Sequence, residues 1–219
     1  AVRKTSNHLS VVTSQKWTDT HATAQRYERQ GNSFGKYQAA FDVVLGKNGL
    51  AWGKGLGPVD QRDGPIKQEG DGKAPAGIFK LGTAFGYDTT AETRLPYLAL
   101  TSTIECVDDS HSQRYNQIVD GAKTTKDWSS SEHMRSMDEL YRKGIVIEHN
   151  MPAAPAAGSC IFLHIWRSPA SPTQGCTAMD QADIARLFSW LDTSQAPLLI
   201  QMPEEQYEQL RARLNLPGR

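Results

Sequence analysis

The chain has 219 residues, and its 24 lysines and arginines are balanced by 24 aspartates and glutamates. A surface that follows a phosphate backbone needs a clear excess of basic residues, so this balance argues against nucleic acid as a partner. The longest apolar runs, VVL and CIFLHIW, are far shorter than the roughly 20 residues that cross a bilayer, so no membrane span is expected.

The first half of the chain predicts short strands separated by turns. Alternating β-branched and aromatic residues predict strands at 8–13, 22–29, 37–46 and 97–109. The sequence GKNG ends the third of these strands in a tight turn. Residues 52–87 are rich in glycine and proline and lack helical periodicity, which favours loops with one short strand around 78–81.

The second half adds helices to further strands. Strands are predicted at 145–150, 160–166 and 197–202. Apolar residues at helical spacing predict a helix over 130–144, a second helix capped by Asp180, and a last helix at 204–214. Strands outnumber helices and no linker or repeat interrupts them, so we expect one mixed, mostly β (α+β) domain over residues 1–219.

The stretch HIWRSPASPTQGC, residues 164–176, joins a histidine on a strand to a cysteine in a polar loop. A cysteine becomes a nucleophile when its thiolate is accessible and a base lies within hydrogen-bond reach, and imidazole is the natural base near neutral pH. Gly175 would let a substrate approach the backbone closely, and its N–H with that of Cys176 would form an oxyanion hole. A lone histidine on a strand is more often structural than catalytic, and His149 on a neighbouring predicted strand is a rival base.

The other two cysteines, Cys106 and Cys160, lie in strand-like surroundings. No Cys-x-x-Cys pair exists, so a structural zinc site is not expected. We predict a Cys106–Cys160 disulfide that leaves Cys176 as a free thiol, with three free cysteines as the alternative.

The residues 161–180 resemble the signature of the L,D-transpeptidase (YkuD-type) catalytic domain family, a histidine followed by Ser/Thr-x-Gly-Cys, here His164 and then residues 173–176. Residues 70–87 are similar to an upstream segment of that family, with Gly72, Pro75, Gly77 and Phe79 in the matching places. The likeness runs over about 40–202. The loop between the histidine and the cysteine is shorter than in most members, so the likeness is to a short-loop branch.

The resemblance implies a β-sandwich-like domain with a few peripheral helices, acting on the stem peptides of bacterial peptidoglycan with neither a metal nor an organic cofactor. Cys176 would attack the carbonyl of an L-centre residue, form a thioester and release a D-amino acid. His164 would move the proton, with Ile165 orienting the imidazole only through its backbone carbonyl. An amine acceptor gives a cross-link; if water is the acceptor, the protein is an L,D-carboxypeptidase or amidase.

Several further residues are candidates for the substrate site. Trp166 and Arg167 follow the histidine at the expected cleft edge. For Trp166, packing is favoured over ligand contact. The Arg167 fork suits a carboxylate, with a solvated surface charge as an equal alternative. Thr173 lies beside the nucleophile, with hydrogen bonding within the loop as its other role. The polar stretch 105–120 offers Asp108, Tyr115 and Asn116 for stem-peptide recognition, or else as a side-chain-stabilised turn.

These patterns are compatible with three functions. A peptidoglycan L,D-transpeptidase exported to the periplasm or cell envelope is the leading hypothesis, followed by a hydrolase on the same fold and then a non-catalytic wall-binding module. The first residue, Ala1, fits a cleaved export signal and fits equally a chain trimmed at that point. The oligomeric state is not predicted.

Overall fold

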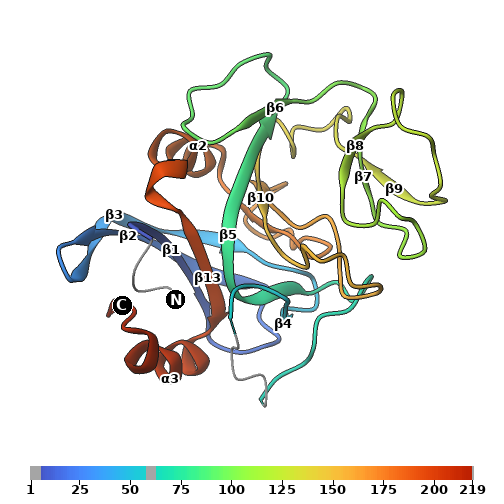
Figure 1. Ribbon diagram of the computed structural model, residues 1–219. Coiled ribbons are helices and arrows are strands. Elements are labelled where there is room, and N and C mark those ends of the chain that lie inside the picture. The colour runs from blue at the N-terminus through green and yellow to red at the C-terminus, as the bar shows by residue number, and fades with distance from the viewer. Residues whose placement is uncertain (1–5, 58–62, 219) are drawn as a thin grey trace.

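The fold is described from a computed structural model, which covers residues 6–57 and 63–218 (Figure 1). The strands are β1 (His8–Ser14), β2 (His21–Gln30), β3 (Ser33–Val44), β4 (Leu50–Trp52), β5 (Ala74–Gly86), β6 (Tyr97–Ala99), β7 (Ile104–Val107), β8 (Ile118–Asp120), β9 (Ser131–His133), β10 (Lys143–Ile147), β11 (Phe162–Ile165), β12 (Thr177–Met179) and β13 (Leu198–Pro203). The helices are α2 (Gln181–Trp190), the short 3-10 helix η1 (Thr193–Gln195) and α3 (Glu204–Leu214). The prediction of a mostly β chain is confirmed.

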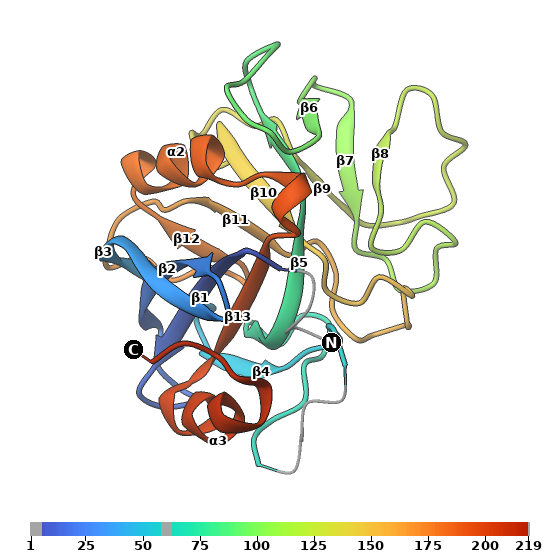
Figure 2. The same ribbon diagram turned by 60° about the vertical axis from the view of Figure 1, so that its left-hand side comes forward.

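Most of the strands belong to one large sheet that is folded back on itself. Within the described residues its order is β10-β11-β12-β3-β2-β1-β13-β5-β4, with β6 beside β5. The long strand β5 pairs with β13 through residues 77–80 and with β10 through residues 81–86. Because β10 begins the order, this second pairing brings the start of the sheet back to β5, as the views in Figures 1 and 2 show.

The two α-helices lie on opposite sides of the large sheet (Figure 2). As predicted, Asp180 caps α2: its side chain accepts a hydrogen bond from Ala182 N at 2.8 Å. The buried face of α2 packs against β10 and β11. The helix α3 packs against β13 and β1, where the ring of Tyr207 is fully buried.

A separate three-stranded sheet, β8-β7-β9, stands beside the large sheet. The predicted disulfide between Cys106 and Cys160 is confirmed. It ties β7 to the chain just before β11. A second hydrophobic cluster fills the space between the sheets; its buried members are Phe85, Leu100, Ile104, Cys106, Met134, Tyr141, Cys160, Phe162 and Cys176. This cluster fixes the small sheet against the part of the large sheet that carries Cys176.

The predicted helix over 130–144 is wrong. Residues 131–133 form β9, which pairs with β7 through Cys106 and Glu132, and turns follow it. Met134 and Tyr141 are buried while Met137 is exposed, so the apolar spacing reflects tertiary packing and not a helix face. Strand pairing here overrides a weak helical preference.

The region 52–87 contains a longer strand than the sequence predicts. The strand β5 has 13 residues, not a few around 78–81. Most of its residues are buried, so the alternation that marks a half-exposed strand is missing. Residues 58–62 of this region and residues 1–5, including Ala1, lie outside the described residues. In the described part, no helix is long and apolar enough to span a membrane.

Candidate active site

A cleft of about 440 Å³ lies where β11 and β12 meet the small sheet. His164 and Cys176 both line it, together with parts of the loop 166–175 and of the segment 132–141. The structure therefore brings together the two residues that the sequence singled out, from opposite ends of that loop.

The pairing of β11 with β12 sets the positions of both residues. The strands are parallel, with His164 opposite Ala178. Because side chains alternate along a strand, Cys176, two residues before Ala178, lies on the same face as His164. The backbone N–H of Phe162 donates to Cys176 Sγ at 3.4 Å, which holds the sulfur beside β11.

His164 is fixed in one tautomer. Its Nδ1 lies 2.7 Å from the carbonyl oxygen of Ile165. A carbonyl only accepts, so Nδ1 carries the proton and Nε2 presents its lone pair. Burial lowers the pKa of His164 to about 4, so the ring is neutral at pH 7, the form that a base requires.

Cys176 is the free cysteine, and it is 8% exposed. Burial, with the nearby Glu132 carboxylate as the next cause, raises the pKa of the Cys176 thiol to about 12. Its S–H donates to the carbonyl oxygen of Cys160 at a distance of 3.6 Å. The resting pair is therefore a neutral imidazole and a protonated thiol.

Tyr141 and Glu132 are cleft residues that sequence reasoning missed. The Tyr141 hydroxyl donates to Glu132 Oε1 at 2.5 Å, and its interaction with the sulfur of Cys176 lowers the pKa of that thiol. The Tyr141 ring packs edge-on against the ring of His164, with centroids 5.2 Å apart. Burial raises the pKa values of both Glu132 and Tyr141. No sequence signal pointed to the pair, because both lay in the wrongly predicted helix.

Thr173 and Gly175, the other two defined residues of the Ser/Thr-x-Gly-Cys part of the family signature, determine the backbone conformation before Cys176. Gly175 has a φ of +154°, a conformation that favours glycine, and a Cβ there would lie 3.2 Å from the carbonyl oxygen of Lys73. The Gly175 N–H donates to Thr173 Oγ1 at 3.1 Å, and the Thr173 hydroxyl donates to Cys176 O at 2.6 Å. The Gly175 donor expected in an oxyanion hole is thus engaged at rest, and Thr173 has the intraloop role considered from the sequence.

Trp166, Arg167 and Asp108 line the cleft, as the sequence led us to expect. Arg167 lies 3.5 Å from the carboxylate of Asp138, and both side chains are substantially exposed. Such exposed ion pairs are weak, so Arg167 remains free to exchange this partner for another carboxylate.

Tyr115 and Asn116 are not among the residues that line the cleft. The Tyr115 hydroxyl donates to Glu69, and the Asn116 amide donates to the carbonyls of His149 and Asn150, at 2.9 Å each. These contacts anchor the loop after β7 to its neighbours, so the structure assigns both side chains to packing and not to the cleft surface.

His149, the rival base, also lies away from the cleft. Its Nε2 donates to the carbonyl oxygen of Ala157 at 2.9 Å, and its Nδ1 accepts from Lys54 N at 3.2 Å. Both ring nitrogens are thus engaged with backbone groups. Among the described residues, no group of three or more His, Cys, Asp or Glu side chains is placed to hold a metal ion.

Comparison with known proteins identifies the family. The family model for YkuD, the L,D-transpeptidase catalytic domain, matches residues 17–200. None of the curated proteins matches the chain significantly. Among solved structures, the helical cell shape determining protein Pgp2 from Campylobacter jejuni is similar with a TM-score of 0.44 and 13% identity, over 91% of this chain and 49% of that chain. This chain therefore spans about half the length of that protein. Because the family model covers most of its length, the chain belongs to the YkuD family of L,D-transpeptidase catalytic domains, whose function concerns the cell wall.

Proposed function

We propose that this protein is a peptidoglycan L,D-transpeptidase that works by cysteine acyl transfer on stem peptides. The observation that carries the proposal is the cleft itself, where a free thiol and a neutral histidine with an unprotonated Nε2 project from one face of paired strands. A thiol nucleophile and an imidazole base are the parts that acyl transfer requires.

In the first half-reaction, Cys176 Sγ bonds to the carbonyl carbon of an L-centre residue while its proton passes to His164 Nε2. The tetrahedral intermediate then loses its C–N bond, and His164 returns the proton to the departing amine. A D-amino acid leaves, and the acyl group stays on sulfur as a thioester. In the second half-reaction, the amine of another stem peptide attacks the thioester, and its proton returns through His164 to the sulfur.

The backbone N–H of Cys176 is proposed to donate to the developing oxyanion. The N–H of Gly175 joins it only after giving up its hydrogen bond to Thr173 Oγ1. Each well-placed donor of this kind is worth about 3 kcal/mol of transition-state stabilisation.

The high pKa of the thiol gives the resting site a second property. A protonated, buried sulfur is a poor nucleophile towards small oxidants and electrophiles. Proton transfer is therefore coupled to attack on a bound carbonyl, and the thiolate does not exist beforehand.

Arg167, Trp166 and Asp108 are proposed to hold the stem peptide at the rim, with Arg167 exchanging Asp138 for a substrate carboxylate.

We also propose that residues 1–219 act as one catalytic domain exported to the cell envelope, in the periplasm. The Cys106–Cys160 disulfide supports this location, because disulfides persist in oxidising compartments.

The proposal is tested by incubating the purified protein with tetrapeptide muropeptides and resolving the products by mass. Cross-linked dimers with release of a D-amino acid are expected; tripeptides alone would reassign the protein as an L,D-carboxypeptidase. Cys176→Ala should abolish both products while the circular dichroism spectrum stays unchanged. Turnover by that variant would refute the mechanism, and a wild-type protein that binds the wall without turnover would favour a non-catalytic module.

The base is tested by a matched pair of histidine variants. His164→Gln should lower turnover by at least about 100-fold, the usual contribution of a general base. His149→Gln changes a histidine of similar burial outside the cleft, and it should retain turnover in whatever fraction remains folded. Equal losses per folded molecule in the two variants would argue against His164 as the base.

A further inference from the structure

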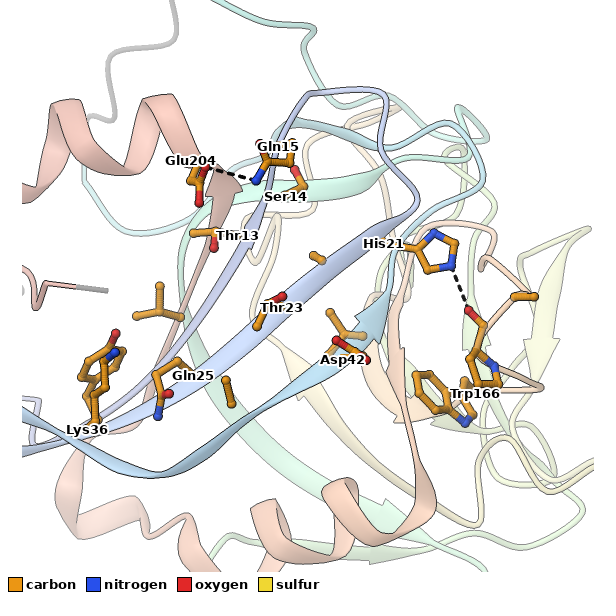
Figure 3. A pocket seen from close by; sticks show the side chains of 17 residues that line it. Thr13, Ser14, Gln15, His21, Thr23, Gln25, Lys36, Asp42, Trp166 and Glu204 are labelled. Atoms are coloured by element: carbon orange, nitrogen blue, oxygen red, sulfur yellow. Dashed lines mark hydrogen bonds between the residues drawn. The ribbon is translucent and has the colours of Figure 1, made fainter.

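A second cavity, a groove of about 680 Å³, lies over β1, β2 and β3 (Figure 3). One end is bounded by Glu204 at the start of α3, and the other by Trp166, Pro169 and Ala170 from the loop between His164 and Cys176. The acyl-transfer mechanism makes no use of this groove.

Strand register places the groove and the catalytic cleft on the same face of one sheet. His164 is opposite Ala178, and Ala178 is opposite Val44. Asp42, two residues from Val44, is opposite Thr23. Because paired residues and their second neighbours share a face, the Asp42 and Thr23 side chains in the groove project to the same side as the cleft residues.

The loop after His164 is the wall between the two cavities. Trp166 borders both of them, Pro169 borders the groove, and Arg167 borders the cleft. The wall is held in place from the sheet: Trp166 N donates to Met179 O at 2.8 Å, and His21 Nε2 donates to Pro169 O at 2.9 Å. A polymer bound across this loop would occupy both cavities.

The groove lining combines hydroxyl and amide groups with an apolar floor. Its uncharged polar side chains include Thr13, Gln15, Thr23 and Gln25, beside His21 and the buried Ser14 and Tyr27. Its charged side chains are one basic residue, Lys36, and two acidic residues, Asp42 and Glu204. Such a lining does not suit a polyanion. Val11, Ala40 and Trp166 add apolar surface. Sugar rings present this same combination, with hydroxyl groups at their edges and C–H groups on their faces.

We propose that the groove binds the glycan strand of the polymer whose stem peptide enters the cleft. This inference rests on the proposed function and extends it, since it names the glycan as a second recognised part of the substrate. Continuity with the cleft around Trp166 favours the same polymer as the occupant of both cavities, and a lining with one basic and two acidic side chains disfavours an anionic polymer. The groove then determines which stem peptides along a strand reach Cys176.

The experiment uses two alanines that are adjacent on β3 and both exposed. Ala40 lines the groove, and Ala39 does not. Binding to glycan strands freed of their peptides is measured by co-sedimentation with each protein. Ala40→Trp should weaken this binding at least tenfold, and Ala39→Trp should leave it unchanged. Thr23→Ala with Asp42→Ala, which adds no bulk, should also weaken it if Ala40→Trp fails to fold.

Turnover gives an independent readout. The ratio of turnover on intact sacculi to turnover on sugar-free stem peptides should fall in Ala40→Trp and hold in Ala39→Trp. Equal glycan binding by both variants and the wild type, competition by sugar-free stem peptides for the groove, or loss of self-association in Ala40→Trp would each overturn the glycan assignment. Glycan binding that persists in a protein inert towards stem peptides would refute the proposed function and leave this inference standing.

Discussion

The thiol of Cys176 hydrogen-bonds the backbone carbonyl of Cys160, with the sulfur 3.6 Å from the oxygen. Cys160 is itself bonded to Cys106 of the small sheet, and its φ of +55° is a left-handed conformation that a non-glycine residue rarely adopts. The partner of the nucleophile is thus held in place by a cross-link, so the disulfide supports the cleft as well as the fold.

Breaking this cross-link should weaken both stability and turnover. Cys106→Ser removes a bridge between residues 54 apart in sequence, which should lower the free energy of unfolding by about 4 kcal/mol. Urea unfolding measures the loss, and reduced wild-type protein should reproduce it. Thiol titration of the denatured, unreduced wild type should find a single reactive group, Cys176; finding three would contradict the disulfide.

Acid should destabilise the protein through its buried histidines. The pKa values of His149 and His164 are about 4 in the folded protein, against 6.5 in an unfolded chain. Between these values only the unfolded chain binds the protons, so stability falls as pH drops from 6.5 to 4 and is unaffected above that window. At the acid end of this window, each histidine lowers the free energy of unfolding by about 3 kcal/mol.

Urea midpoints at pH 7 and pH 4.5 measure this effect. His164→Gln should show a smaller difference between the two than the wild type, because one of the protonating groups is gone. The same difference in both proteins would mean that His164 is not held neutral by burial.

Glu132 and Tyr141 should shift the reactivity of Cys176 in opposite directions. Glu132→Gln removes a charge that raises the pKa of the thiol, so alkylation at pH 8 should accelerate. Tyr141→Phe removes a hydrogen bond that lowers this pKa, so alkylation should slow. A hydrogen bond to a charged group is worth about 2 kcal/mol, which corresponds to a change of at least about tenfold. Iodoacetamide labelling followed by mass spectrometry provides the rates, and shifts of the same sign would disprove the arrangement.

Gly175→Ala should cost stability and turnover together. The added methyl group meets the carbonyl of Lys73 at 3.2 Å, and the φ of +154° is strained for alanine, at a cost of about 1–3 kcal/mol. Gly218→Ala is the control, since its nearest contact is an ordinary 3.6 Å with the Arg211 side chain. Thermal melting and the muropeptide assay should separate the two variants; identical behaviour would show that the backbone at 175 is unstrained.

The strands and helices marked by local signals could be predicted from the sequence. The cap at Asp180 and the apolar stripe of α2 lie within one short segment. The alternation that places His164 and Leu163 on different faces of β11 lies within another. Such patterns depend only on residues close in sequence, which is why the bounds of α3 were also predicted correctly.

Features created by distant pairing could not be predicted in the same way. The strand β9 forms because β7 lies beside it, and β5 is long because buried neighbours cover most of it. Tyr141 lies beside Cys176 only because the chain folds, since the two residues belong to no common sequence motif. For Tyr115, the polar stretch left substrate recognition and a stabilised turn equally open, and its hydrogen bond to Glu69, which is distant in sequence, favours the structural role.

The parallel pairing of β11 with β12 has a consequence for how this chain tolerates change. Backbone hydrogen bonds between rigid strands, and not the intervening loop, determine the distance between imidazole and sulfur. Residues inserted near Pro169 would bulge into solvent and leave the two reacting groups where they are. The architecture thereby separates the alignment of its chemistry from the shape of its rim, and each can vary without the other.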